Sequence, residues 1–185
     1  MKTIFPSSNF RFLLAAALFA VAAVSAPAQQ SARPMPSPPA QADVTLGGQQ
    51  VVVKYNSPAM RGRKIMGGLV PWGQEWRTGA NPATTIITPV DLMIGDLHVP
   101  AGTYTLFTLP VNEHEWKFIV STKTGEWGIP YPAGNDLGRT AMHVGTLPAP
   151  QESMTISFEH TTANSTELHV KWETTDVSVP VKVAK

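Results

Sequence analysis

The sequence predicts an all-β domain, arranged as a two-sheet antiparallel sandwich or a jelly-roll-like fold. Short runs rich in β-branched residues recur about every ten residues from Val44 onward, and Gly, Pro and Asn separate them. No long stretch has the apolar period of a helix. About ten short strands in roughly 140 residues favour two sheets, because each sheet then buries the apolar face of the other.

The N-terminal residues 1–28 predict a cleavable signal peptide. Lys2 and Arg11 supply positive charge, and the uncharged apolar run from Phe12 to Val24 is shorter than the about 20 residues that span a bilayer. Ala26-Pro27-Ala28 offers the small residues that signal peptidase requires, which predicts cleavage after Ala28. We therefore expect a periplasmic or secreted protein with no stable membrane insertion after cleavage.

Residues 29–42 predict an extended, solvated linker, since Pro34, Pro36, Pro38 and Pro39 stand there among Ser, Ala and Gln. The all-β domain is then expected over residues 43–185.

Charge and cysteine content exclude several classes of function. Without Lys2 and Arg11 the chain carries 12 basic and 13 acidic side chains, from 14 and 13 in the whole sequence, so no nucleic-acid partner is expected. The absence of cysteine excludes disulfides, thiol nucleophiles and thiolate metal sites. The sequence also lacks the short motifs of common hydrolases, metalloproteases and nucleotide-binding proteins, and it predicts no cofactor.

Two glycine-containing turns predict hairpins in the first half of the domain. Gly47-Gly48 separates Val44 to Leu46 from Gln49 to Tyr55, and glycine accepts the positive φ of a two-residue turn. Gly95-Asp96 separates Leu92 to Ile94 from Leu97 to Val99 in the same way.

The later strands are predicted from alternation. A turn at Val99 to Gly102 leads into a strand that ends at Pro110, and Trp116, Phe118 and Val120 then share one apolar face.

The last third gives the clearest alternation. Met154, Ile156, Phe158 and His160 share one face, and Leu168, Val170 and Trp172 share the corresponding face of the next run, which predicts a hairpin over the turn Thr161 to Ser165. A separate last strand is expected around Val177 to Val183. Pro180 suggests that this strand lies at a sheet edge, because proline has no N–H.

The segment from Val70 to Asn81 resembles the bacterial secreted domain of unknown function 2911 family, and its W-R-T-G-A-N string is the specific part of the match. Pro82 stands where members of that family often carry Glu. The resemblance implies secretion and a β-rich domain. It also extends over Tyr55 to Pro58, Arg61 to Gly67, Ala101 to Pro110, Glu126 to Gly128, Tyr131, Asp136 to Arg139, and Trp172 to Thr175.

Arginines form the first candidate binding group. Arg61 and Arg63 point to the same side if their segment is extended, and Arg77 begins the turn that ends at Asn81. A guanidinium cluster of this kind binds a carboxylate or a phosphate through parallel hydrogen bonds. The alternative is that arginines bind turn carbonyls or carboxylates and fix loops to the sheets, and the many charged partners in the chain favour it. Arg77 is accordingly expected to be a largely buried loop clasp.

Aromatic side chains form the second candidate group. Trp116 and Trp172 lie on apolar strand faces and are expected in the core. Trp72, Trp76 and Trp127 lie in segments flanked by Gly or Pro, and with Tyr131 they would line a groove for a sugar or another small molecule. Packing in the core or anchoring of loops is the alternative role for these rings, and it is the favoured one.

Carboxylates and histidines complete the candidates. Glu75 and Asp136 are the pair that a glycan hydrolase would use, although ion pairing with arginine is the favoured explanation for both. No metal site is predicted, because His160 is expected on an apolar face, partly buried, while His169 and the other histidines are expected at the surface.

The function that these observations favour is non-enzymatic binding of a small molecule or glycan, or an envelope-associated role. The alternatives are a secreted hydrolase that uses Glu75 or Asp136 and a module that binds another protein. The tentative ligand-binding residues are Arg61, Arg63, Trp72, Trp76, Arg77, Asn81, Trp127, Tyr131, Asp136 and Arg139.

Overall fold

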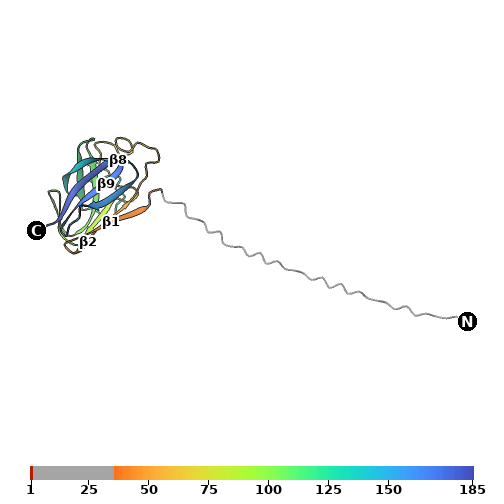
Figure 1. The fold of residues 1–185 in the computed structure, drawn as a ribbon, viewed down its shortest axis with the longest axis horizontal. Coiled ribbons are helices and arrows are strands. Elements are labelled where there is room, and N and C mark those ends of the chain that lie inside the picture. Colours follow the sequence, from red (N-terminus) through yellow and green to blue (C-terminus); the bar gives the residue numbers. More distant parts are fainter. Residues whose placement is uncertain (2–35) are drawn as a thin grey trace. The chain divides into compact units, whose positions relative to one another are not determined.

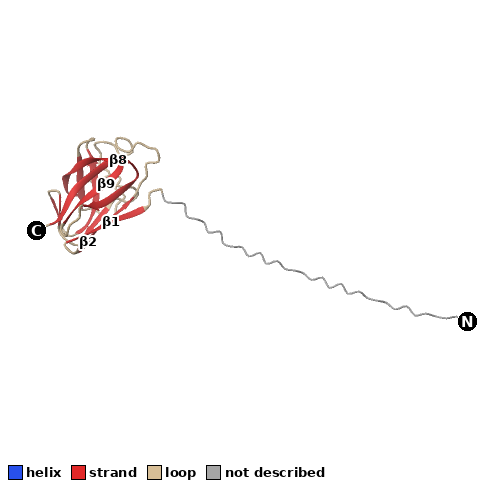
Figure 2. Ribbon diagram, in the orientation of Figure 1, coloured by secondary structure: helices blue, strands red, loops and turns tan. Residues whose placement is uncertain are grey.

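The computed structural model describes residue 1 and residues 36–185 (Figure 1). Apart from Met1, the predicted signal peptide at residues 1–28 lies outside these residues, as does the linker up to residue 35. The described chain is all-β and contains no helix (Figure 2). Accordingly, no helix long and apolar enough to cross a membrane is found in this part of the chain.

Nine strands form one antiparallel sheet in the order β1-β2-β3-β6-β7-β8-β9-β4-β5. Their bounds are β1 Pro39–Leu46, β2 Gln49–Asn56, β3 Thr85–Thr88, β4 Leu92–Ile94, β5 Leu97–Val99, β6 Gly102–Pro110, β7 Trp116–Ser121, β8 Asp136–Glu159 and β9 Ser165–Val183.

The first strand begins earlier than the sequence predicts. β1 begins at Pro39, inside the segment 29–42 that was predicted as linker, and it pairs with β2 along its whole length. Ala40, Ala42, Val44 and Leu46 alternate on the less exposed face. The two alanines bury too little surface to give a clear period-2 signal, so the strand was predicted only from Val44.

Both predicted glycine hairpins are confirmed. Gly47 and Gly48 have φ values of 58° and 75° and join β1 to β2, where Leu46 pairs with Gln49. Gly95, with a φ of 58°, joins β4 to β5.

The hairpin over residues 161–165 is also confirmed, but its strands are much longer than predicted. β8 has 24 residues and β9 has 19, and their pairing shifts register between Thr146 and Thr155. Glu173, in β9, has a φ of 54°, a left-handed conformation that is uncommon outside glycine. The predicted last strand at Val177 to Val183 is therefore the second half of β9 and not a separate element.

Pro180 does not lie on an edge strand, which corrects the sequence prediction. β9 lies between β8 and β4 in the sheet. Pairing with β8 ends at Ser178, and pairing with β4 begins at Val181. Proline is tolerated there because its position falls between the two ladders, where no N–H is required.

One large core unites both ends of the sheet. Val44 of β1, Phe118 of β7 and Val179 of β9 belong to the same cluster of buried residues. Trp116 and Trp172 are each 1% exposed, which confirms their predicted core position. A second, smaller cluster of Ala83, Phe107 and Ile119 lies apart from it, with Tyr131 packed against it.

Candidate functional site

The W-R-T-G-A-N loop is joined to the sheet through Trp76. The backbone of Trp76 exchanges hydrogen bonds of 2.8 and 2.9 Å with Thr108 of β6. Its ring stacks on Trp172 with centroids 5.9 Å apart and planes inclined by 22°. Its indole Nε1–H donates to the carbonyl of Gly79 at 3.1 Å, which closes the loop on itself. Trp76 therefore fixes both the position and the shape of this loop.

The same loop contains two residues in the left-handed region. Thr78 has a φ of 51° and Asn81 a φ of 58°. A β-branched residue in this conformation is a true outlier, and it persists only where its surroundings impose it. Thr78 is 1% exposed, its hydroxyl lies 3.2 Å from that of Thr108, and its carbonyl accepts a hydrogen bond from the Thr84 hydroxyl at 2.7 Å. Backbone strain of this kind is often found at functional sites.

Beside this loop is a cavity of about 280 Å³, which we call the Arg–Trp hollow. It brings together three of the ten predicted site residues, Arg63, Trp76 and Arg77. The sequence placed Trp172 only in the core and gave no signal for Leu69 or Ile129, yet all three line the hollow. The full lining is Ser37, Pro58, Arg63, Leu69, Val70, Trp76, Arg77, Gly79, Ala80, Ile129 and Trp172.

Both arginines of the hollow are positioned by backbone carbonyls. Arg63 donates from Nε to Met60 at 2.9 Å and from Nη2 to Ala59 at 2.7 Å. Arg77 donates from Nη1 to the Trp127 carbonyl at 2.9 Å, and its guanidinium carbon lies 5.3 Å from the centroid of the Trp127 ring. Partial burial lowers the pKa of Arg77 below its ordinary value. Arg77 is thus a loop clasp, but it is half-buried and not largely buried as predicted.

Arg61 and Asn81 bind the beginning of the domain instead of lining the hollow. Arg61 donates from Nη2 to the carbonyl of Pro36 at 2.7 Å, and Asn81 donates from Nδ2 to that of Ser37 at 3.2 Å. These two predicted site residues hold residues 36 and 37 against the sheet.

Tyr131, Asp136 and Arg139 form a second group together with Glu75. Arg139 donates to Asp136 Oδ2 at 2.7 Å, and its Nη2 lies 3.2 Å from both Glu75 Oε1 and the Tyr131 hydroxyl. Tyr131 donates its hydroxyl to Asp136 and packs edge-on against Phe107 with centroids 4.9 Å apart. Desolvation, followed by the hydrogen bond to Asp136, raises the pKa of Tyr131 well above its ordinary value.

This group joins the loops that carry Glu75 and Tyr131 to β8, which carries Asp136 and Arg139. One guanidinium bridges Glu75 and Asp136, so the two candidate carboxylates of a hydrolase share a cation. A substrate oxygen or a water placed between them would have to displace Arg139. None of these four side chains lines the Arg–Trp hollow.

Trp127 and Gly128 lie next to Arg77. Trp127 is 56% exposed, so its ring is available to solvent. Gly128 has a φ of 80°, and a Cβ on it would lie 2.9 Å from Cβ of Ala83 and 3.0 Å from Cβ of Arg77. Glycine is needed here both for the left-handed backbone and for the close approach of this loop to Arg77.

Trp72 borders a different and larger cavity of about 720 Å³. Its ring packs edge-on against Trp116 with centroids 6.3 Å apart. Lys64, His114 and Glu173 also line this cavity. Glu173 accepts backbone N–H groups of Ile65 and Met66 at 3.4 and 3.2 Å, a contact that the sequence did not signal.

The histidine placement expected from the sequence is wrong for His160 and His169. The His160 side chain is 72% exposed and that of His169 only 10%. His160 follows the last residue of β8 and has a φ of 51°, which breaks the strand alternation and turns its ring toward the polar face that carries His169. The two rings, expected on opposite faces, have centroids 6.3 Å apart.

A family model described as "Protein of unknown function (DUF2911)" matches residues 37–181. The match begins two residues before β1 and ends within β9, so it covers the sheet except the last two residues of β9 and includes every residue that lines the two cavities described above. No curated protein and no solved structure matches the chain. On the strength of the family model, this chain belongs to the DUF2911 family.

Proposed function

We propose that this protein is an exported domain that binds a small carboxylate-bearing molecule or glycan in the Arg–Trp hollow. The observation that carries the proposal is the position of Arg63 and Arg77, which both border a cavity whose other lining includes the stacked Trp76–Trp172 pair. Aromatic faces contact the C–H face of a sugar, and guanidinium groups bind carboxylates through parallel hydrogen bonds.

Preorganisation supports this function. Two backbone carbonyls fix the Arg63 guanidinium and one fixes that of Arg77, so less side-chain entropy is lost when a ligand binds. A guanidinium has five N–H donors, which leaves donors on each arginine for a ligand. Leu69 and Ile129 are 47% and 67% exposed and would add apolar contacts to a sugar ring or a small-molecule body.

Binding measurements with matched oligosaccharides test the proposal. We expect an oligosaccharide with uronic-acid residues to bind more tightly than a neutral one of equal length, because only the first carries a carboxylate. The variant Arg63→Gln should reduce that preference, because only Arg77 then remains, and weaken binding of the uronic-acid oligosaccharide by about tenfold or more through the loss of a charge-assisted hydrogen bond.

Lys182→Gln is the charge-matched control. It removes one exposed positive charge that does not line the hollow, so it should bind as the wild type does. Equal binding by Arg63→Gln and wild type, or no binding of either kind of oligosaccharide or of small carboxylates, would refute the proposal.

We also propose that the sheet closes into the two packed layers of a sandwich. β8 pairs with β7 through residues 136–142 and with β9 through later residues, so one long strand belongs to both parts of the sheet. β1 contacts β8 and β9 although it is distant from both in strand order. Nuclear Overhauser effects between side chains of β1 and β8 would support this arrangement, and an open sheet would lack them.

A further inference from the structure

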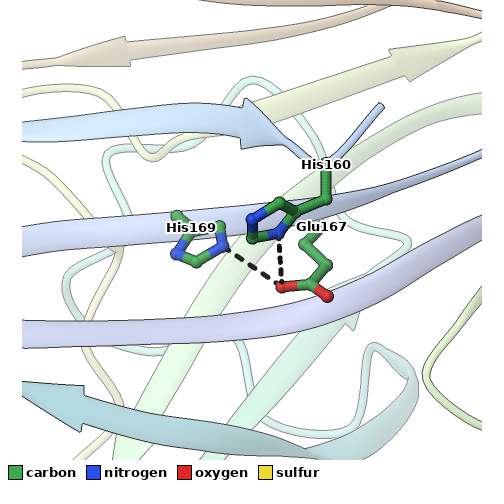
Figure 3. A group of neighbouring side chains, drawn as sticks. All are labelled: His160, Glu167 and His169. Atoms are coloured by element: carbon green, nitrogen blue, oxygen red, sulfur yellow. Dashed lines mark ion pairs between the residues drawn. The ribbon is translucent and has the colours of Figure 1, made fainter. Parts of the chain in front are cut away.

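Three side chains converge at the turn end of the β8–β9 hairpin (Figure 3). Glu167 and His169 are two positions apart on β9 and share a face. His160 reaches the same face because its left-handed backbone reverses the alternation of β8. Figure 3 shows both imidazole rings directed at the Glu167 carboxylate.

The distances among these groups suit a shared ion. Glu167 Oε2 lies 3.4 Å from His160 Nδ1 and 3.4 Å from His169 Nε2, and the three atoms lie within 4.8 Å of one another. Typical N–H···O hydrogen bonds are shorter, about 2.7–3.2 Å. Two ligands of a tetrahedral zinc ion, each about 2.0–2.1 Å from the metal, are about 3.3 Å apart. The separations of 3.4 Å therefore agree better with two ligands of one ion than with direct hydrogen bonds.

The atom that most strongly indicates a bound ion is His169 Nε2. It is fully buried and has no hydrogen-bond partner among the described residues. Buried polar atoms without partners are rare in proteins, and an ion is one of the established reasons for them. The other ring nitrogen, Nδ1, lies 2.7 Å from Asp176 Oδ1.

The Asp176 contact settles which nitrogen carries the proton. A carboxylate accepts and does not donate, so Nδ1 bears the hydrogen and the lone pair of Nε2 points toward Glu167. Metal-binding histidines are oriented by a carboxylate behind the ring in this way. If His169 were instead an imidazolium between two carboxylates, Nε2–H would donate to Glu167, and no such bond is formed.

A further carboxylate adds negative charge. Glu159 Oε2 lies 3.9 Å from His169 Nε2. Lys171 donates a hydrogen bond to the other oxygen of Glu159 and lies 3.7 Å from Asp176 Oδ2, so its ammonium group offsets part of this charge.

We infer that His160, Glu167 and His169 bind one divalent transition-metal ion, zinc being the best fit, at the end of the β8–β9 hairpin. Two imidazoles and one carboxylate suit zinc, whereas magnesium and calcium favour sites made only of oxygen. The exposed ring of His160 leaves one side of the ion open to solvent or to a ligand. The site shares no residue with the Arg–Trp hollow, so it is a second and independent property of the protein.

Zinc content of the protein purified without a histidine tag tests the inference. We expect one equivalent of zinc per chain, removed by a chelator and restored by zinc but not by magnesium. Zinc should also raise the melting temperature, because an ion that binds only the folded state stabilises it.

Two substitutions, at the exposed His160 and the half-buried Glu167, identify the ligands without changing the hydrophobic core. His160→Ala and Glu167→Gln should each weaken zinc binding by more than about tenfold, and Asp176→Asn, behind His169, should weaken it by about 10–100-fold. His98→Ala is the matched control, since His98 Nε2 lies 3.5 Å from Asp91 Oδ2 on the surface and is paired with only one carboxylate. It should bind zinc as the wild type does.

Imidazole ¹⁵N resonances provide a second readout that does not depend on these variants. One equivalent of zinc should shift His160 Nδ1 and His169 Nε2 and leave His98 unchanged. The inference is overturned if no equivalent of zinc binds, if His160→Ala and Glu167→Gln both keep wild-type affinity, or if other histidines shift instead.

Discussion

The ring of Trp76 stacks on that of Trp172 with centroids 5.9 Å apart, and this contact joins a loop to the centre of β9. Trp172 is 1% exposed and donates its indole N–H to the Glu152 carbonyl at 3.1 Å. A rigid ring of the core thus supports a half-buried ring beside the hollow. The shape of the hollow consequently depends on the packing of these two side chains.

Replacing Trp76 by alanine should lower the free energy of unfolding by about 2–4 kcal/mol, through lost burial and lost stacking. Urea unfolding curves measure this change. Trp127→Ala is the control, since that ring is 56% exposed and its loss should cost less than about 1 kcal/mol. Equal midpoints for Trp76→Ala and the wild type would show that the stacked pair does not support the loop.

Arg77→Ala should lower the free energy of unfolding by about 1–2 kcal/mol, the range for a charged hydrogen bond that is partly open to solvent. The bond at stake runs from Arg77 Nη1 to the Trp127 carbonyl at 2.9 Å. Amide exchange should accelerate in the loop around Trp127, because that carbonyl loses its partner. If stability and exchange were both unchanged, Arg77 would not act as a clasp for this loop.

Gly128→Ala should destabilise the protein more than Gly125→Ala. Both glycines have positive φ, 80° and 76°, so both substitutions place alanine in an unfavourable backbone conformation. Only the Cβ added at Gly128 meets neighbours closer than 3.1 Å, whereas that at Gly125 meets none within 4 Å. The midpoint difference between the two variants, about 1 kcal/mol or more, measures this close packing. Equal effects would show that the loop relaxes freely away from Arg77.

Tyr131 should make the protein sensitive to alkaline pH. Its pKa is raised in the folded state, so its contribution to stability is fully present below the ordinary tyrosine value and is lost as pH rises toward the folded value. Stability should therefore begin to decline near pH 10, about the ordinary pKa of tyrosine. Tyr131→Phe should flatten this decline, and Tyr104→Phe serves as the control because Tyr104 makes no contact with Asp136. An identical alkaline decline in Tyr131→Phe would contradict this explanation.

Local sequence patterns predicted most of the sheet. Turn glycines and strict alternation identified the hairpins at residues 47–48, 95–96 and 161–165, because those signals come from residues close together in the chain. The left-handed backbone of β9 at Glu173 was not predictable, since glutamate leaves no local sequence signal for this conformation. The position of the His160 side chain was not predictable for the same reason. The side chain was expected on the apolar face, and its left-handed backbone turns it to the other face.

The candidate sites were predictable to the same extent: residue types within one segment were recognised, but contacts between distant segments were not. Arg63 and Arg77 were predicted in the arginine group and Trp76 in the aromatic group, and the fold brings these three to one cavity. The ion pairs that join Glu75, Asp136 and Arg139 span up to 64 residues of sequence, so one chain alone does not fix their separation. The convergence of His160 with His169 required a backbone conformation that only the fold imposes.

The indole N–H resonances of the protein test the central claim, ligand binding in the Arg–Trp hollow, most directly. The five tryptophans give five such signals, and Trp76 and Trp172 line this hollow while Trp72 and Trp116 line the larger cavity. Titration with a uronic-acid oligosaccharide should shift the signals of Trp76 and Trp172 and leave those of Trp72 and Trp116 in place. Shifts confined to Trp72 and Trp116, or no shift at all, would contradict the assignment of binding to this hollow.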